Sequence, residues 1–342
     1  MSNKCCKKTS IGGQAVIEGV MMKGPKRTVL AVRGSDGNIV VEDVDCKPVK
    51  NKFLKLPIIR GVVGFVNSML LGYKTLMRSA DLSGMTDLEE EQDKQKMEKK
   101  AEKLAAKKGI SKDEALEIIK CKSNKAIDIL LGAVMVIASV LGVLLAVALF
   151  IYAPSYVFDL IQKVVPTDIT KLAPLFEGIL KVILFVGYIL LVSQMNDIKR
   201  VFKYHGAEHK TIFCYEAGLE LTVENVKKQI RFHPRCGTSF MFLMIAVSIL
   251  VSTILVLIFP DIREVTYVWG TIKLLLVPLF CGLGYELIKL CGKYDNIATR
   301  IIAAPGLWIQ RITTKEPDDD MIEVAIESLK PVIPENGEDI IG

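Results

Sequence analysis

The three histidines of this 342-residue chain lie close together, between positions 205 and 233. His205 and His209 are one helical turn apart, so on a helix their imidazoles project from the same face. His233 and Cys236 flank a proline and an arginine, which is the spacing of a tight chelating loop. Imidazole and thiolate together favour zinc over magnesium or calcium. The sequence therefore predicts a zinc site with four ligands, namely His205, His209, His233 and Cys236.

A glutamate between the first two histidines raises the question of catalysis. Glu208, with His205 and His209, matches the His-x-x-Glu-His pattern of one group of zinc peptidases. In that pattern the glutamate is the general base toward a metal-bound water, so Glu208 is the candidate catalytic residue. The pattern also requires a downstream carboxylate ligand, and three glutamates are available: Glu216, Glu220 and Glu224.

The number of protein ligands separates two hypotheses from different functional classes. Three ligands and a water make a catalytic site, here a membrane-embedded metal-dependent hydrolase acting on a lipid or a peptide. Four ligands close the site and make it structural, as in a non-catalytic scaffold or a membrane-protein assembly factor. Because four ligands are present in the sequence, metal binding as such is favoured and both hypotheses stay open.

The composition indicates a mainly α-helical polytopic membrane protein with large charged parts. Hydrophobic residues make up 51% of the chain and charged residues 24%, and the mean hydropathy is +0.36. A helix needs about 20 apolar residues to cross a bilayer. Four transmembrane helices are predicted, at Ala126–Ala153, Ile179–Met195, Thr238–Phe259 and Val268–Leu290. The charges near their ends are expected to snorkel to the interface; they are Lys181, Lys273, Glu286 and Lys289. A transporter is less favoured, because no acidic residue lies deep within a predicted span and no internal repeat is evident.

Basic residues are distributed unevenly among the connecting segments. Lys120, Lys122 and Lys125 precede the first span, and residues 196–237 carry eight lysines and arginines. The positive-inside rule then places both termini and residues 196–237 in the cytosol. The net charge of +6 fits an anionic lipid surface. Specific binding of nucleic acid is not expected, because the basic residues lie beside apolar runs.

The remaining segments differ from one another in amino-acid composition. Two β-rich runs around a turn predict a small N-terminal β unit, and a short apolar stretch predicts an interfacial helix. Pro305 and Gly306 are expected to break any helix after the last span, with Trp308 as an interface anchor. The predicted regions are a disordered tail (1–10), the β unit (11–50), an interfacial or packing helical segment (53–81), a charged tether (84–125), a four-span membrane domain (126–311) with a cytosolic metal-site loop (196–237), and an acidic tail (312–342) containing a short helix to Lys330.

Four sequence blocks together resemble the YqhQ-like family; they are Gly12–Met22, His205–Lys210, His233–Thr238 and Ala304–Gln310. The resemblance covers about residues 11 to 320. Members of that family are multi-pass bacterial membrane proteins of unknown function, often labelled as predicted metal-dependent enzymes. The resemblance implies a bacterial plasma membrane location and metal dependence, but neither a reaction nor a substrate. The partners expected are the lipid bilayer and either anionic lipid or a membrane-protein assembly partner.

Overall fold

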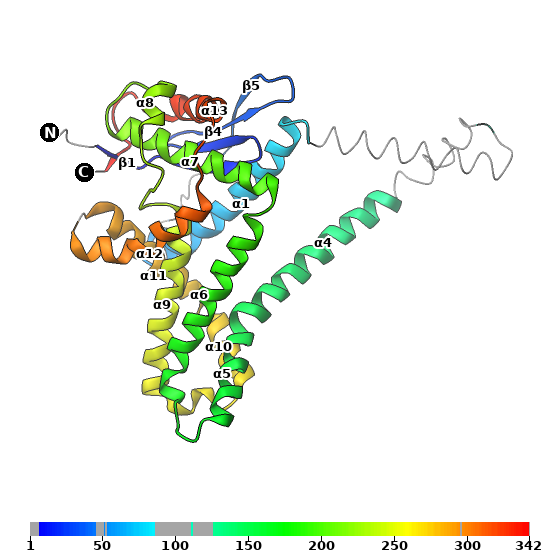
Figure 1. Cartoon of the computed structure of the whole chain (residues 1–342), viewed down its shortest axis with the longest axis vertical. Coiled ribbons are helices and arrows are strands. Elements are labelled where there is room, and N and C mark those ends of the chain that lie inside the picture. The colour runs from blue at the N-terminus through cyan, green and yellow to red at the C-terminus, as the bar shows by residue number, and fades with distance from the viewer. Residues whose placement is uncertain are drawn as a thin grey trace. The chain divides into compact units, whose positions relative to one another are not determined.

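The computed structural model describes residues 7–45, 51, 53–85, 111, 126–294 and 296–341. Its contacts divide the chain into two units, one of residues 1–83 and 154–342 and the other of residues 84–153. The second unit contains α4 (Ala126–Val147), which a π-helical turn (Ala148–Tyr152) continues. Apart from residues 84, 85 and 111, the charged tether predicted over 84–125 lies outside the described residues. The sheets and the other helices belong to the first unit (Figure 1).

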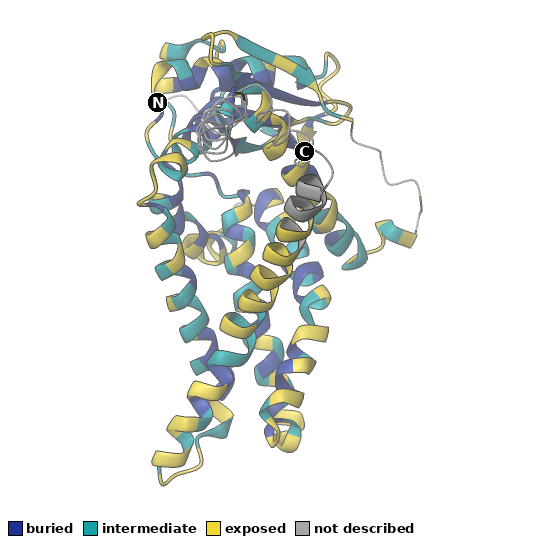
Figure 2. Ribbon diagram, turned by 90° about the vertical axis from the view of Figure 1, so that its right-hand side faces the viewer, coloured by how far each residue is buried: buried dark blue, intermediate teal, exposed yellow. Residues whose placement is uncertain are grey.

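A four-stranded antiparallel sheet with the strand order β2-β3-β4-β5 confirms the predicted N-terminal β unit. The strand bounds are Gly12–Val16, Gly19–Lys23, Thr28–Arg33 and Ile39–Asp43. Helices cover both faces of β3 and β4, so these strands are apolar along almost their whole length. β3 and β4 are largely buried, whereas the long helices are exposed over much of their length (Figure 2).

Helices pack on both faces of this sheet. α7 (Asn196–Glu216) and α13 (Asp319–Leu329) cover one face and share a hydrophobic core with it. α1 (Ile59–Leu82) covers the other face, where Leu71 packs against apolar residues of β2, β3 and β4. The site-bearing helix α7 is therefore held against a rigid support.

Both ends of the described chain are ordered where tails were predicted. β1 (Lys8–Thr9) pairs with β6 (Ile340–Ile341), which differs from the disordered tail predicted over 1–10. Residues 1–6 lie outside the described residues. The acidic tail predicted over 312–342 contains α13, where a short helix was predicted. Met321 of that helix is 0% exposed, so the segment is not a free tail. The acidic segment is thus part of the core, because its apolar positions face the sheet.

Three described helices are long and apolar enough to cross a membrane, namely Ile137–Val164, Thr170–Val192 and Gly237–Ile258. A fourth candidate is the pair α10 (Thr266–Leu275) and α11 (Val277–Lys293), bent by 46° at their break. Pro278 follows that break and cannot donate a backbone hydrogen bond to α10. The remaining helices are α5 (Ala153–Val164), α6 (Ala173–Val192), α8 (Val223–Lys227), α9 (Gly237–Ile258) and the short helices at Phe53–Lys55, Thr170–Leu172, Pro260–Arg263 and Lys330–Val332.

The helix α12 (Ile297–Thr313) runs through Pro305 and Gly306, so the predicted break does not occur. A Cβ added at Gly306 would lie 2.4 Å from the Ser239 hydroxyl of α9. The glycine therefore serves close packing of α12 on α9, and this packing offsets the hydrogen bond that the proline removes. Trp308 is 72% exposed, as an interface anchor would be.

Charged side chains inside the apolar helices form a buried network instead of snorkelling. Lys273 Nζ of α10 lies 2.8 Å from Glu177 Oε2 of α6, and both residues are almost fully buried. Arg263 contacts the same carboxylate at 3.0 Å, and Ser155 and Trp269 donate hydrogen bonds to it. The predicted snorkelling is therefore wrong for Lys273, because a partner on another helix compensates its charge. Glu177 also lies within the candidate span Thr170–Val192, whereas no acidic residue was expected deep within a span.

At the other end of α11, Glu286 is paired with Arg60 of α1, whose Nε lies 2.7 Å from Oε1. A Cβ added at Gly61 would lie 2.9 Å from the Cα of Gly282, so the two helices touch at their backbones. The segment predicted as interfacial or packing over 53–81 thus packs closely on α11.

The buried network generates a stability prediction. Glu177→Gln leaves Lys273 and Arg263 buried beside a neutral group, and breaking a buried pair in this way typically destabilises by about 3–5 kcal/mol. We expect the Tm of the protein in detergent to fall by on the order of 10 °C. The control is Asp159→Asn, since the Asp159 side chain is 32% exposed. Equal Tm values for the wild type and Glu177→Gln would contradict the role of the network.

The orientation predicted from basic residues can be tested at two exposed positions. Lys228 lies in the segment between α6 and α9, and Asp168 in the connection between α5 and α6. We expect a cysteine at position 168, but not at position 228, to react with an impermeant maleimide added to intact cells. The parent protein controls for native thiols, and the opposite pattern would reject the orientation.

Candidate metal centre

The helix α7 carries the first two predicted ligands on one face. Tyr204 and Ala207 of α7 are buried in the core against the sheet, which fixes the rotation of the helix. A Cβ added at Gly206 would lie 2.0 Å from the Lys315 carbonyl oxygen, so only glycine fits there. With the helix held in this way, the rings of His205 and His209 lie 4.4 Å apart between centroids, as their spacing predicted.

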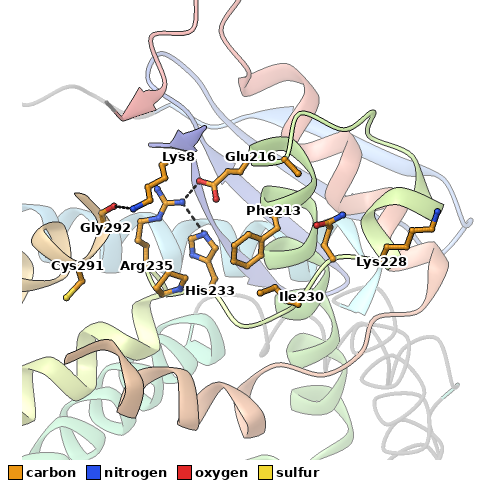
Figure 3. A pocket seen from close by; sticks show the side chains of 12 residues that line it. Lys8, Phe213, Glu216, Lys228, Ile230, His233, Arg235, Cys291 and Gly292 are labelled. Atoms are coloured by element: carbon orange, nitrogen blue, oxygen red, sulfur yellow. Dashed lines mark hydrogen bonds and ion pairs between the residues drawn. The ribbon is translucent and has the colours of Figure 1, made fainter. Parts of the chain in front are cut away.

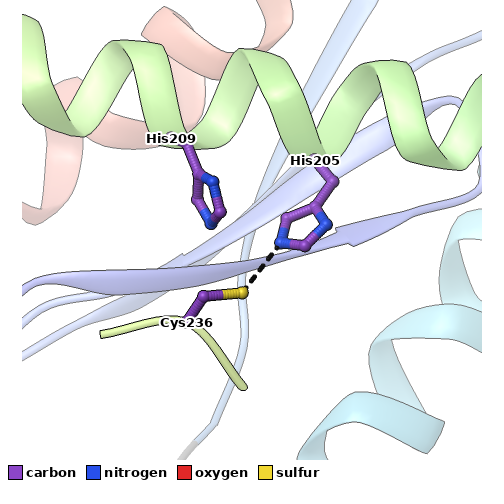
Figure 4. A group of neighbouring side chains, drawn as sticks. All are labelled: His205, His209 and Cys236. Atoms are coloured by element: carbon purple, nitrogen blue, oxygen red, sulfur yellow. Dashed lines mark hydrogen bonds between the residues drawn. The ribbon is translucent and has the colours of Figure 1, made fainter. Parts of the chain in front are cut away.

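Cys236 meets these histidines from the start of α9. It precedes the first residue of that helix in an extended conformation. Its Sγ lies 3.1 Å from His205 Nε2, as Figure 4 shows. One ligand atom from each of His205, His209 and Cys236 lies within 4.8 Å of the other two, a group that could hold a metal ion. The structure thus brings together three of the four predicted ligands.

Both imidazoles are oriented by backbone carbonyls. His205 Nδ1 lies 2.9 Å from the Thr313 carbonyl oxygen, and His209 Nδ1 lies 2.5 Å from that of Arg231. A carbonyl oxygen only accepts, so each Nδ1 carries the proton and each Nε2 is left for the site. This is the arrangement in which metal-ligating histidines are usually held. The donor set and its orientation therefore fit zinc.

Charge in this buried site is concentrated on the thiol. Burial raises the pKa of the Cys236 thiol. His205 and His209 together lower it by more, so the net pKa lies well below its usual range. Burial lowers the pKa of His205, whereas the Cys236 thiolate and Glu208 raise it, to about 9. The thiolate that results is the form of cysteine that binds metals.

Glu208 lies beside the three donors and is 4% exposed. Burial raises its pKa, and His209, His205 and the backbone N–H of Gly13 act in the opposite direction. The net shift is upward, in the direction that makes a carboxylate a better general base. A Cβ added at Gly13 would lie 3.0 Å from Glu208 Cγ, so the glycine-rich strand β2 borders the site. From the sequence, this strand was identified only as part of the β unit and of a motif block.

His233 lies next to the group but outside it. Its Nε2 accepts a hydrogen bond from Arg235 at 3.3 Å, although its ring lies 5.4 Å from that of His209. Burial, with His209 and Arg235 beside the ring, holds the pKa of His233 well below the usual range, so His233 is neutral. Its backbone N–H and C=O are both bonded to Gln310 of α12, at 2.7 Å each. Sequence reasoning identified Gln310 only as part of a motif block.

The downstream glutamates do not join the three donors. Glu216 accepts hydrogen bonds from Arg235 and from the Thr9 backbone N–H. Among the described residues, neither Glu220 nor Glu224 belongs to a group able to hold a metal. A pocket of about 420 Å³ lies beside His233, with Arg235, Glu216 and Phe213 in its wall (Figure 3).

Comparisons with known proteins show the family of the chain. Residues 56–335 match the model of a family described as protein of unknown function (DUF1385). The chain is 35% identical over 325 residues to a Bacillus subtilis protein described as uncharacterized protein YqhQ, covering 94% of this chain and 92% of that relative. No solved structure matches.

The geometry predicts which substitutions release the metal. We expect one zinc ion per purified chain, and loss of it in His205→Ala, His209→Ala and Cys236→Ala. Replacing a residue that hydrogen-bonds to a ligand typically lowers metal affinity by about 10- to 100-fold. Removing a ligand itself should lower the affinity by more. His233→Ala is the matched control and should keep its zinc. Elemental analysis by mass spectrometry measures this, and equal losses in His233→Ala and His209→Ala would restore the four-ligand site.

Proposed function

The chain belongs to the DUF1385 family, and we propose that it is a zinc-dependent hydrolase of the bacterial plasma membrane. His205, His209 and Cys236 are its zinc ligands, and Glu208 is its general base. The observation that carries this proposal is the separation of His233 from the other three donors. Three ligands leave a coordination position for water or substrate, which four would fill.

The residues around the site suit hydrolysis. Zinc bound here would act as a Lewis acid and make water a better nucleophile. Glu208 accepts the proton of the attacking water and returns it to the leaving group. The carbonyls of Thr313 and Arg231 keep the two imidazoles in the tautomer that ligation requires.

The proposed location is the cytosolic side of the membrane. Support comes from the basic residues of 196–237 and from the position of Cys236 immediately before the candidate span Gly237–Ile258. A site at the end of a span can reach substrates within or beside the bilayer. The bilayer is then the constant partner, and the exposed Trp308 is its interface anchor.

A test of catalysis changes Glu208 alone. Glu208→Gln keeps the shape but cannot accept the proton, so we expect turnover to fall by about 10²- to 10⁴-fold. Zinc content and Tm should stay at wild-type values. Turnover is measured by mass spectrometry on peptide, ester and phospholipid mixtures, with a chelator-treated sample as the blank.

The same variant distinguishes the scaffold hypothesis. A structural zinc predicts that Glu208→Gln restores the growth phenotype of a deletion strain, while His205→Ala and Cys236→Ala fail because the protein loses its clamp and is degraded. Full complementation by a zinc-replete Glu208→Gln protein would reject the hydrolase.

A further inference from the structure

We propose that the substrate is an extended polypeptide, which binds by adding a strand to the free edge of β2 beside the metal centre. This inference rests on the proposed hydrolase function and adds its substrate class. Among the described residues, β2 pairs with β3 alone, and α7 packs along it. No described strand pairs with its other edge, which is where a further strand could add.

The backbone groups at this edge can be identified from the hydrogen bonds of the neighbouring strands. Arg33 N donates to Glu18 O, so the even-numbered residues of β3, such as Val20, face β4. The odd-numbered residues of β3 then face β2, where their partners are even-numbered. Gly13 and Ala15 therefore direct their N–H and C=O groups to the free edge.

Few of these groups are used within the protein. The Gly13 N–H faces Glu208, and in the described part of the chain no hydrogen bond engages the Gly13 carbonyl or either backbone group of Ala15. Ala15 is partly exposed. The edge thus offers one donor and two acceptors.

The opposite edge of the sheet is protected in the usual way. β5 carries Glu42 and Asp43, which pair with Arg78 and Arg27. Charged side chains on an edge strand prevent further pairing. The described residues of β2 are instead small or uncharged. This contrast indicates that β2 is left open for binding.

The unpaired edge of β2 also runs next to Glu208, the proposed general base. Glu208 lies at Gly13, and the two-residue step from Gly13 to Ala15 spans about 6.8 Å along a strand. Consider a substrate residue that is hydrogen-bonded to both backbone groups of Ala15. The substrate residue about two positions further along would then lie opposite Gly13, next to Glu208 and the zinc ligands. Alternating N–H and C=O groups at this spacing match a polypeptide, whereas a lipid ester offers no such donors.

The test compares two zinc-binding probes on the full-length, zinc-loaded protein in detergent. Acetohydroxamate binds only the metal, whereas trialanine hydroxamate adds a backbone that can pair with β2. We expect trialanine hydroxamate to bind at least about tenfold more tightly by calorimetry, the gain of two or three hydrogen bonds. Equal affinities on the wild type would overturn the proposal.

Proline substitution then locates the gain. Ala15→Pro removes the outward N–H and disturbs no ladder bond. It should lose the tenfold gain and keep the acetohydroxamate affinity. Val41→Pro is the matched control, because Val44 N donates to Thr28 O and the odd-numbered residues of β5 therefore face outward at the far edge. A gain that persists in Ala15→Pro would reject pairing with β2.

A second measurement avoids any folding defect of the variant. Replacing an amide N–H of trialanine hydroxamate by an ester oxygen should weaken its binding to the wild type several-fold. An unchanged affinity for every such analogue would also reject the proposal. Failure of acetohydroxamate itself to bind would show that the zinc has no open position, and would reject the hydrolase together with its substrate.

Discussion

A thiolate shielded from water is stable only beside positive charge, and the arrangement around Cys236 follows from that requirement. His205 and His209 overcome the effect of burial on its pKa. These imidazoles are in turn held by carbonyls from segments distant in the chain. The negative charge of Cys236 thus brings together side chains and carbonyls from α7, the beginning of α9 and the end of α12. A metal ion would compensate the same charge with the ligands already turned toward it.

The parts of the centre that depend on helical period were predictable from the sequence. His205 and His209 share a face because they are one turn apart, and that geometry is local. His233 was assigned from its distance to Cys236 along the chain, which sets reach but not direction. Arg235 bonds its Nε2, and Gln310 fixes its backbone. Neither partner follows from the spacing.

The errors in the membrane segments have a related cause. Snorkelling treats each helix as if it were alone, whereas Lys273 is buried because Glu177 lies on another helix. Pro305 and Gly306 are breakers in isolation, but α12 continues because Gly306 lets it approach α9. Apolar helices long enough to cross a membrane could be predicted, since length and apolar character suffice for them, and so could a small β unit. The burial of Lys273 and the continuation of α12 depend on contacts with other helices, which the sequence does not show.

The short ladder between β1 and β6 has a topological consequence. It joins the two ends of the described chain, Lys8–Thr9 and Ile340–Ile341, so both ends must lie on the same side of any membrane that the chain crosses. If the candidate spans of the described residues are its crossings, their number has to be even. The three single helices do not meet that condition, whereas counting the bent pair α10 and α11 as a fourth span would.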